Sequence, residues 1–169
     1  TADHGLAVGH HGLLGKQNPY DHSTRVPFIV AGPGVPAAAT DATPIYLQDV
    51  MATTLELAGA DKPEHVFYTS LLPRLGPADA PPRRPYASIY GSYLDRQRSI
   101  THDGWKLIVY PTAKVVRLYH LADDPQETVD LAAMPAHANR LSDLFVRLVA
   151  LQQQLGDTKS DADAKHSRF

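Results

Sequence analysis

The chain has 169 residues, 43% of them hydrophobic and 20% charged, which is the balance of a folded globular protein and excludes a disordered one. A net charge of −2 gives no basic surface for nucleic acid, and no apolar run of about 18 residues predicts a membrane span. Cysteine is absent, which excludes disulfides, thiolate metal sites and a cysteine nucleophile within these residues.

The chain opens with the polar cluster Thr1-Ala2-Asp3-His4-Gly5 and no signal-peptide pattern. Such an opening is typical of a piece of a longer protein, although a processed N-terminus would look the same. An Asp followed by a His at the end of a strand offers a carboxylate oxygen and an imidazole nitrogen to one divalent cation. The alternative is a turn that its own side chains stabilise.

A second cluster, Gly9-His10-His11-Gly12-Leu13-Leu14-Gly15-Lys16, holds three glycines in seven residues. Glycine lets the backbone approach a ligand closely, and Lys16 offers a mobile cation to an anionic group. The alternative is a solvated loop with a surface lysine. Adjacent histidines without further spaced ligands are a poor metal signature, so His10 and His11 do not predict a metal site.

The third cluster is Asp21-His22-Ser23, and it is not a catalytic triad, because a triad is assembled from separated segments. Arg25 is expected to be a structural ion-pair residue. The apolar run Val26–Ala31 ends at Gly32-Pro33-Gly34 and predicts a buried, parallel strand.

A helix is expected next, because apolar residues recur at helical spacing and Gly59 follows at a C-cap position. These residues are Tyr46, Leu47, Val50, Met51, Thr54, Leu55 and Leu57. Five prolines within residues 73–85 predict a linker or an exposed loop. The expected strand and helix before it are characteristic of an α/β fold.

The second half predicts a small α+β subdomain over residues 86–155. Four segments rich in β-formers predict an antiparallel meander: Tyr86–Tyr93, Arg98–His102, Lys106–Tyr110 and Arg117–Leu121. Asp103-Gly104 is a hairpin signal between the second and third segments. Regularly spaced leucines predict an amphipathic helix over 139–155 that packs on the sheet. The polar residues 156–169 are expected to be a disordered tail.

In order along the chain, Thr-Ala-Asp-His-Gly, Gly-His-His-Gly-Leu-Leu-Gly-Lys and Arg-Val-Pro-Phe-Ile-Val-Ala-Gly-Pro-Gly resemble the C-terminal part of the sulfatase family, in the alkaline phosphatase superfamily. The resemblance continues through 47–59, Ser70-Leu71-Leu72-Pro73, Trp105-Lys106-Leu107-Ile108 and the Leu-Tyr-x-Leu-x-x-Asp-Pro-x-Glu pattern that starts at Leu118. It implies an α/β fold: residues 1–72 as the C-terminal part of the catalytic core, then the linker, then the antiparallel-sheet subdomain.

The resemblance also implies roles for individual residues. Asp3 and His4 match ligands of a divalent metal, usually calcium. Lys16 matches the lysine that contacts the sulfate and stabilises the departing oxygen, a catalytic and substrate-binding role. His11 matches a histidine with an expected role in lining the substrate site or ordering its loop. Asp123-Asp124-Pro125 is expected to be a turn that orders the C-terminal sheet.

The family's formylglycine nucleophile arises from a Cys/Ser-x-Pro/Ala-x-Arg motif, and this sequence contains no such motif. The expected function is therefore the C-terminal portion of a sulfate-ester hydrolase that is inactive by itself and binds metal weakly. Two alternatives stay open: a phosphodiesterase or phosphonate monoester hydrolase of the same superfamily, and a non-catalytic truncated or interaction module. The sulfate ester is the expected substrate of the full-length enzyme. Apolar surface over residues 26–58, suited to the rest of the fold, predicts self-association.

Overall fold

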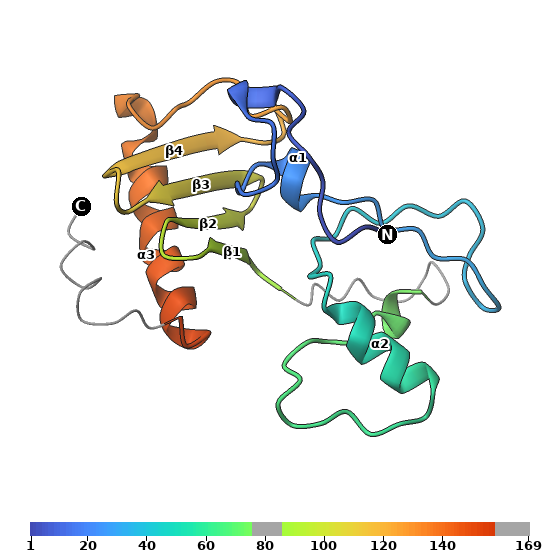
Figure 1. Ribbon diagram of the computed structural model, residues 1–169. Coiled ribbons are helices and arrows are strands. Elements are labelled where there is room, and N and C mark those ends of the chain that lie inside the picture. The colour runs from blue at the N-terminus through green and yellow to red at the C-terminus, as the bar shows by residue number, and fades with distance from the viewer. Residues whose placement is uncertain (76–85, 158–169) are drawn as a thin grey trace. The chain divides into compact units, whose positions relative to one another are not determined.

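The computed structural model describes residues 1–75 and 86–157, which divide into two units (Figure 1). The helical unit spans Phe28–Ile89 and the sheet unit combines Ala2–Pro27 with the chain from Tyr90 onward. This grouping differs from the sequence-based boundaries, which placed residues 1–72 together. The reason lies in the contacts of residues 2–27, which pack on the C-terminal sheet.

The sheet unit is built on four antiparallel strands in the order β1-β2-β3-β4. They are β1 (Ile89–Tyr93), β2 (Gln97–His102), β3 (Trp105–Tyr110) and β4 (Val115–His120). Between β2 and β3, Asp103 and Gly104 have φ values of 50° and 75°, the left-handed geometry that a two-residue hairpin turn requires. The turn pairs His102 with Trp105 and fixes the register of the hairpin. The predicted meander is confirmed.

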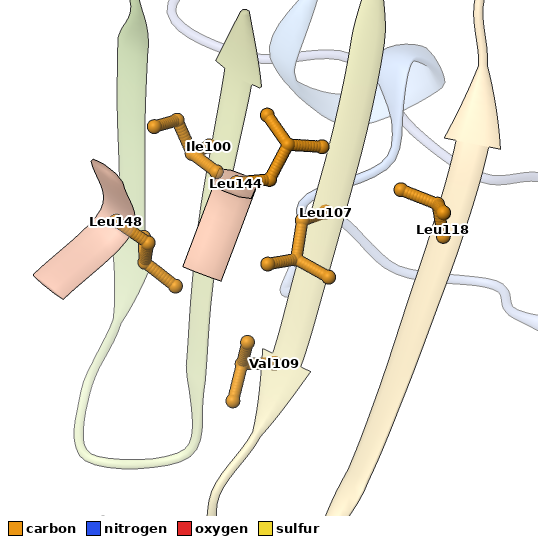
Figure 2. Packing of buried hydrophobic residues seen from close by; sticks show 6 residues of the cluster. All are labelled: Ile100, Leu107, Val109, Leu118, Leu144 and Leu148. Atoms are coloured by element: carbon orange, nitrogen blue, oxygen red, sulfur yellow. The ribbon is translucent and has the colours of Figure 1, made fainter. Parts of the chain in front are cut away.

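One face of the sheet packs on helix α3 (Ala138–Gln154). The apolar side chains of β2, β3 and β4 on this face point toward the leucines of α3 (Figure 2). The buried cluster consists of Ile100, Leu107, Val109, Leu118, Leu144 and Leu148. Side chains alternate between the two faces of a strand, so the residues between these positions must face the other way. The predicted helix and its packing on the sheet are confirmed.

The opposite face of the sheet is covered by residues from the start of the chain. Tyr20 packs with Ile108 and Tyr119, and its hydroxyl lies 3.4 Å from the hydroxyl of Tyr119. Lys106 lies on the same side of β3 as Ile108 and is 2% exposed. The short helix α1 (Asp21–Thr24) follows Tyr20 directly. The sheet is therefore a middle layer with α3 on one face and the residues around α1 on the other.

The helical unit contains α2 (Asp49–Leu57) and the 3-10 helix η2 (Leu72–Arg74). Gly59 has φ 64°, the left-handed conformation predicted for the residue that ends α2. The carboxylate of Asp49 is fully buried and accepts the backbone N–H groups of Tyr46 at 2.9 Å and Thr69 at 3.0 Å. This carboxylate therefore joins the start of α2 to the segment that precedes η2.

The prediction of a strand over Val26–Ala31 is wrong, because these residues have no regular secondary structure. A strand needs a hydrogen-bonded neighbour, and within residues 1–75 and 86–157 all four paired strands come from the C-terminal meander. Ile29 is 84% exposed, although the prediction required it to be buried. The boundary between the two units falls inside this run, after Pro27.

Most of the expected linker and tail lies outside the described residues. Of the linker over 73–85, Pro73 and Arg74 belong to η2, and residues 76–85 are not described. The tail was expected to be disordered from residue 156, but Asp157 is held by an ion pair with the buried Arg98, whose Nη2 donates to Asp157 Oδ1 at 3.0 Å. Residues 158–169 are not described. Among the described helices, none has the length and apolar character to cross a membrane.

Candidate functional site

Lys16 and the Asp3-His4 pair, singled out separately in the sequence, lie together in the sheet unit. The ammonium of Lys16 contacts Nε2 of His4, and this nitrogen lies 3.2 Å from Oδ2 of Asp3. The loop between them is closed by two backbone hydrogen bonds, from Ala7 N–H to Gly15 O at 3.1 Å and from Gly9 N–H to Leu13 O at 2.8 Å. The cluster Asp3–His4–Lys16 is the candidate site.

The tautomer of His4 is assigned from the contact of one ring nitrogen with a backbone carbonyl. Its Nδ1 lies 3.1 Å from the carbonyl oxygen of Gly5, which can only accept a hydrogen bond, so Nδ1 carries the proton. Nε2 is then left with a lone pair that faces Lys16. Donation of one ring N–H to a backbone carbonyl is the arrangement that prepares the other nitrogen as a ligand for a cation.

The donor atoms of Asp3 and His4 suit one divalent ion in spacing but not in number. Ligands at about 2.3–2.6 Å from an ion in roughly perpendicular directions lie about 3.3–3.7 Å apart, close to the 3.2 Å between Asp3 Oδ2 and His4 Nε2. Calcium takes about six to eight donors. No group of three or more His, Asp or Glu side chains suited to a metal occurs in the described parts of the chain. Asp3 and His4 therefore fit as part of a coordination shell that other donors would complete.

Gly5 follows the cluster at a point where the backbone of α1 comes very close. Its N–H donates to the carbonyl of Ser23 at 3.0 Å, and a Cβ atom at this position would lie 1.9 Å from the carbonyl oxygen of His22. Only glycine fits there. The glycine of the Asp-His-Gly sequence is therefore required by the approach of α1.

His11 packs its ring on Tyr20, with centroids 4.0 Å apart and an interplanar angle of 7°. It adopts φ 55° at the tip of the glycine-rich loop, within the 3-10 helix η1 (His10–Gly12). This stacking attaches the loop to the residue that covers the sheet. Contact between His11 and a substrate stays a prediction.

His22, which the sequence excluded from a triad, lines a cleft of about 240 Å³ beside α1. The residues around the cleft are His10, Asp21, His22, Arg25, Pro125, Gln126 and Glu127. Burial lowers the pKa of His22, and the neighbouring His11, His10 and Lys106 lower it further. Nη1 of Arg25 lies 3.7 Å from Oδ2 of Asp21, which is the structural ion pair expected for this arginine.

Lys106 and Glu127 were assigned no role from the sequence, yet they form a buried ion pair beneath α1. Lys106 Nζ lies 2.7 Å from Glu127 Oε1, donates to Asp21 Oδ1, and donates to the carbonyl of Pro19 at 3.2 Å. The backbone N–H of Asp21 donates to Glu127 Oε2 at 2.6 Å. Burial raises the pKa of Glu127, and the ammonium of Lys106 acts against that rise. The available signal was a lysine as the second residue of an otherwise apolar strand, because a buried ammonium needs an anion and other acceptors around it.

Downstream of β4, Asp124 confirms the expected turn. Its carboxylate accepts the hydroxyl of Thr128 at 3.0 Å and the N–H of Val129 at 2.8 Å. Its own N–H donates to the carbonyl of His120 at 2.8 Å. The turn thereby directs the chain toward Glu127, and the Asp-Pro-x-Glu pattern has a structural reason in this sequence.

The fold and the sequence motifs together define the C-terminal portion of a sulfatase, with the α/β fold of the alkaline phosphatase superfamily. The profile of the family described as "N-sulphoglucosamine sulphohydrolase, C-terminal" matches residues 9–154. The chain belongs to this family.

Two curated relatives agree with this assignment. Arylsulfatase K of Xenopus laevis is 27% identical over 144 residues, which cover 78% of this chain and 27% of that protein. Choline-sulfatase of Rhizobium meliloti (strain 1021) is 34% identical over 139 residues, covering 79% of this chain and 26% of that protein. The chain thus spans roughly a quarter of the length of these relatives.

Solved structures match the chain over nearly its whole length. One, described as a complex with its substrate D-glucosamine-2-N,6-O-disulfate, has a TM-score of 0.80 at 26% identity and covers 95% of this chain and 34% of its own. A putative sulfatase from Bacteroides thetaiotaomicron has a TM-score of 0.78 at 25% identity, with 99% and 39% covered. The phosphonate monoester hydrolase of Agrobacterium radiobacter has a TM-score of 0.75 at 23% identity, with 90% and 34% covered, and shares the fold.

Proposed function

We propose that this chain supplies one part of the active site of a sulfate-ester hydrolase, with Lys16 as the group that binds the sulfate. The observation that carries the proposal is the contact of Lys16 with His4 beside the carboxylate of Asp3. It joins a mobile cation and two potential metal ligands at one point. Sulfate-ester hydrolysis needs both kinds of group, because negative charge develops on the departing oxygen as the ester bond breaks.

Asp3 and His4 would hold a divalent cation, most simply calcium, together with donors from outside this chain. Such an ion would supply Lewis-acid stabilisation of the ester oxygens. The chain's own residues supply the rest of this half of the site. The bond from His4 Nδ1 to Gly5 O keeps Nε2 directed at the cluster. The side chain of Asp3 is 80% exposed, so its carboxylate is accessible to an ion. Lys16 contributes a positive charge that needs no proton transfer to act.

The proposal includes inactivity of the 169-residue polypeptide by itself. It holds no cysteine and no Ser-x-Pro/Ala-x-Arg motif from which formylglycine could be made. Incubation of the isolated chain with an aryl sulfate ester is expected to give no turnover above the buffer rate. Turnover by the isolated chain would contradict this part of the proposal.

The decisive experiment uses the full-length protein that carries this segment and compares Lys16→Ala with Lys114→Ala, a turn residue between β3 and β4. Lys16→Ala is expected to lower kcat/KM for an aryl sulfate by roughly 10²–10³, the usual cost of removing one oxyanion-stabilising group. Lys114→Ala is expected to leave it unchanged. An unchanged rate in Lys16→Ala would overturn the proposed role.

A phosphate or phosphonate ester is the second candidate substrate, because the same fold occurs in a phosphonate monoester hydrolase. A lysine beside a metal suits either tetrahedral anion. Parallel assays with an aryl sulfate, an aryl phosphate and a phosphonate monoester distinguish the two classes by the larger kcat/KM. A non-catalytic module predicts no turnover of any of them, no calcium binding and no Cys/Ser-x-Pro/Ala-x-Arg motif in the upstream reading frame.

A further inference from the structure

Helix α1 and Tyr20, the residue directly before it, are linked to both segments that form the candidate site. On one side, the carbonyl of Ser23 accepts the N–H of Gly5, which directly follows His4. On the other side, the N–H of Tyr20 donates to Asn18 Oδ1 at 3.2 Å, and Asn18 Nδ2 donates back to the carbonyl of Gly15 at 3.4 Å. The position of α1 therefore affects the backbone next to His4 and next to Lys16.

Four residues are too few for α1 to hold its own shape, since a helix of this length has a single closing turn. Its position comes from the sheet beneath it. The ammonium of Lys106 donates to Pro19 O and Asp21 Oδ1 and forms an ion pair with Glu127 Oε1. Glu127 Oε2 accepts the N–H of Asp21. The side chains of Lys106 and Glu127 are 3% and 2% exposed.

We infer that Lys106 and Glu127 are positioning residues for the Asp3–His4–Lys16 cluster and act through α1. They come from β3 and from the turn after β4, more than eighty residues away from the cluster along the chain. The inference rests on the proposed function, because only that function makes the cluster an active site. The contacts between Lys106, Glu127 and α1 can be tested without any assay of turnover.

The chemistry of the network favours positioning over simple stabilisation. A buried ion pair is seldom more stable than apolar residues of similar volume, because both charges lose their hydration. The ammonium and the carboxylate add hydrogen bonds whose directions fix the position of the backbone that they contact. Their contacts reach two successive parts of the chain, the carbonyl of Pro19 and the backbone and side chain of Asp21. Apolar packing alone would supply no such directional contacts to α1.

The test measures the geometry of the cluster in the isolated, isotope-labelled chain. Three variants are compared with the wild type: Glu127→Gln, Lys106→Met and, as a matched control, Arg98→Met. Arg98 also carries a buried ion pair on the sheet, but its partner is Asp157, beyond α3. Two quantities are recorded by NMR: the exchange rate of the Gly5 amide, and the NOE between the Lys16 ε-methylene and the His4 ring. Urea unfolding of each variant gives the correction for global stability.

Lys106→Met and Glu127→Gln are expected to speed exchange of the Gly5 amide by about tenfold or more after that correction, because they release α1 locally. Both are expected to weaken the NOE between Lys16 and His4. Arg98→Met is expected to change neither, even where it lowers global stability. Gln at 127 keeps an oxygen for the N–H of Asp21, so the Glu127→Gln chain decides the matter if Lys106→Met does not fold.

Equal Gly5 exchange in all three variants after correction would overturn the inference. An unfolded Glu127→Gln chain would overturn it too, because the network would then be a requirement of the fold as a whole. Neither result bears on whether the full-length protein hydrolyses sulfate esters, and a failure of that activity would leave the NMR result standing.

Discussion

The ammonium of Lys16 contacts Nε2 of His4, although twelve positions separate the two residues in the sequence. Nδ1 of the same ring is used by Gly5 O, so the Nε2 lone pair is the one that Lys16 shares. A metal ion bound to His4 would need this lone pair. Lys16 and a divalent cation are therefore expected to compete for one atom, and the competition can be measured.

Calcium binding to the isolated chain is expected to be weak and to depend on all three residues of the cluster. Asp3→Asn and His4→Ala remove a ligand each and are expected to abolish the binding heat in calorimetry. Lys16→Met removes the competing positive charge and is expected to tighten binding, by roughly threefold to tenfold for a nearby unit charge in a partly exposed site.

Lys114→Met is the control for the change in net charge, because it removes the same charge away from the cluster. It is expected to leave the affinity as in the wild type. Weaker calcium binding in Lys16→Met than in the wild type would contradict the competition.

Truncation of Leu107 is expected to destabilise the sheet unit strongly. Leu107 is fully buried between β2, β4 and α3, so Leu107→Ala leaves a cavity and should lower the free energy of unfolding by about 2–5 kcal/mol. Val146→Ala, on the exposed side of α3, should stay within about 0.5 kcal/mol. Urea unfolding followed by the fluorescence of Trp105, the single tryptophan, measures both. Equal losses of stability in Leu107→Ala and Val146→Ala would contradict the packing of α3 on the Leu107 face of the sheet.

Asp130 is expected to contribute to acid sensitivity. Burial acts to raise the pKa of its carboxyl, but the donors Arg117, Leu118 N–H and Ala132 N–H outweigh burial and hold the pKa below its ordinary value. With the folded-state pKa lowered, its contribution to stability is present above the unfolded pKa of about 4 and is lost as the pH falls through the folded value.

The wild type is accordingly expected to lose stability between about pH 4 and the acid range below it, and Asp130→Asn to lose less over the same interval. Asp61→Asn, at an exposed position of the helical unit, is the control for removing one carboxylate away from Asp130. Urea unfolding at a series of pH values gives the slopes. A steeper slope in Asp130→Asn would reverse the sign argued for this group.

Asp49 is expected to be essential for the order of the helical unit. Its carboxylate accepts the N–H groups of Tyr46 and Thr69 and the hydroxyl of Tyr86. In Asp49→Asn an amide NH₂ must face one of these donors, at a cost of about 1–3 kcal/mol for each buried group left unpaired. Exchange of the Thr69 amide is expected to accelerate.

Tyr86 gives a second measurement of the same change. Burial, and then the hydrogen bond and charge of Asp49, raise the pKa of Tyr86 to about 12. In Asp49→Asn this pKa is expected to fall while staying above its ordinary value, since burial is the larger cause. An NMR titration of the Tyr86 ring shows the shift, and an unchanged pKa would contradict the contact.

Self-association through the helical unit stays a prediction. Ile29 and Phe67 are 84% and 83% exposed, and Met51 and Leu57 of α2 are also exposed. Sedimentation velocity of the isolated chain is expected to show a sedimentation coefficient that rises with concentration, and Ile29→Lys with Phe67→Lys should reduce the rise. Val146→Lys in the sheet unit is the control. A single monomeric species at high concentration would contradict the prediction.

The elements that could be predicted from the sequence are those set by local periodicity and turn chemistry. The four strands, the Asp103-Gly104 turn, α3 and the end of α2 at Gly59 all follow from patterns within some twenty residues. Val26–Ala31 could not be predicted in the same way. Its composition is that of a strand, but whether it pairs depends on segments distant in the sequence, and composition carries no information about those.

Only part of the candidate site could be predicted from the sequence. The residue types of Asp3, His4 and Lys16 were visible as motifs, and their convergence follows from a short loop between them. The contacts of Lys106 and Glu127 beneath them could not be predicted from the spacing of those motifs. Lys106 and Glu127 are adjacent only because β3 and the turn after β4 lie under α1, and no spacing rule connects them with Asp21. Folding alone brings the three charges together.

The alternation along β3 limits where this polypeptide can be cut. In a fragment that began at Tyr86, Leu107 and Val109 would still pack on α3. Ile108 and Tyr119 would lose their contact with Tyr20 and become exposed to solvent. Lys106 would keep Glu127 and lose Asp21 and the carbonyl of Pro19. The meander is therefore a poor module for transplantation. Residues 1–27 of the chain must be kept together with the four strands, whatever is inserted in or removed from the segment that separates them in the sequence.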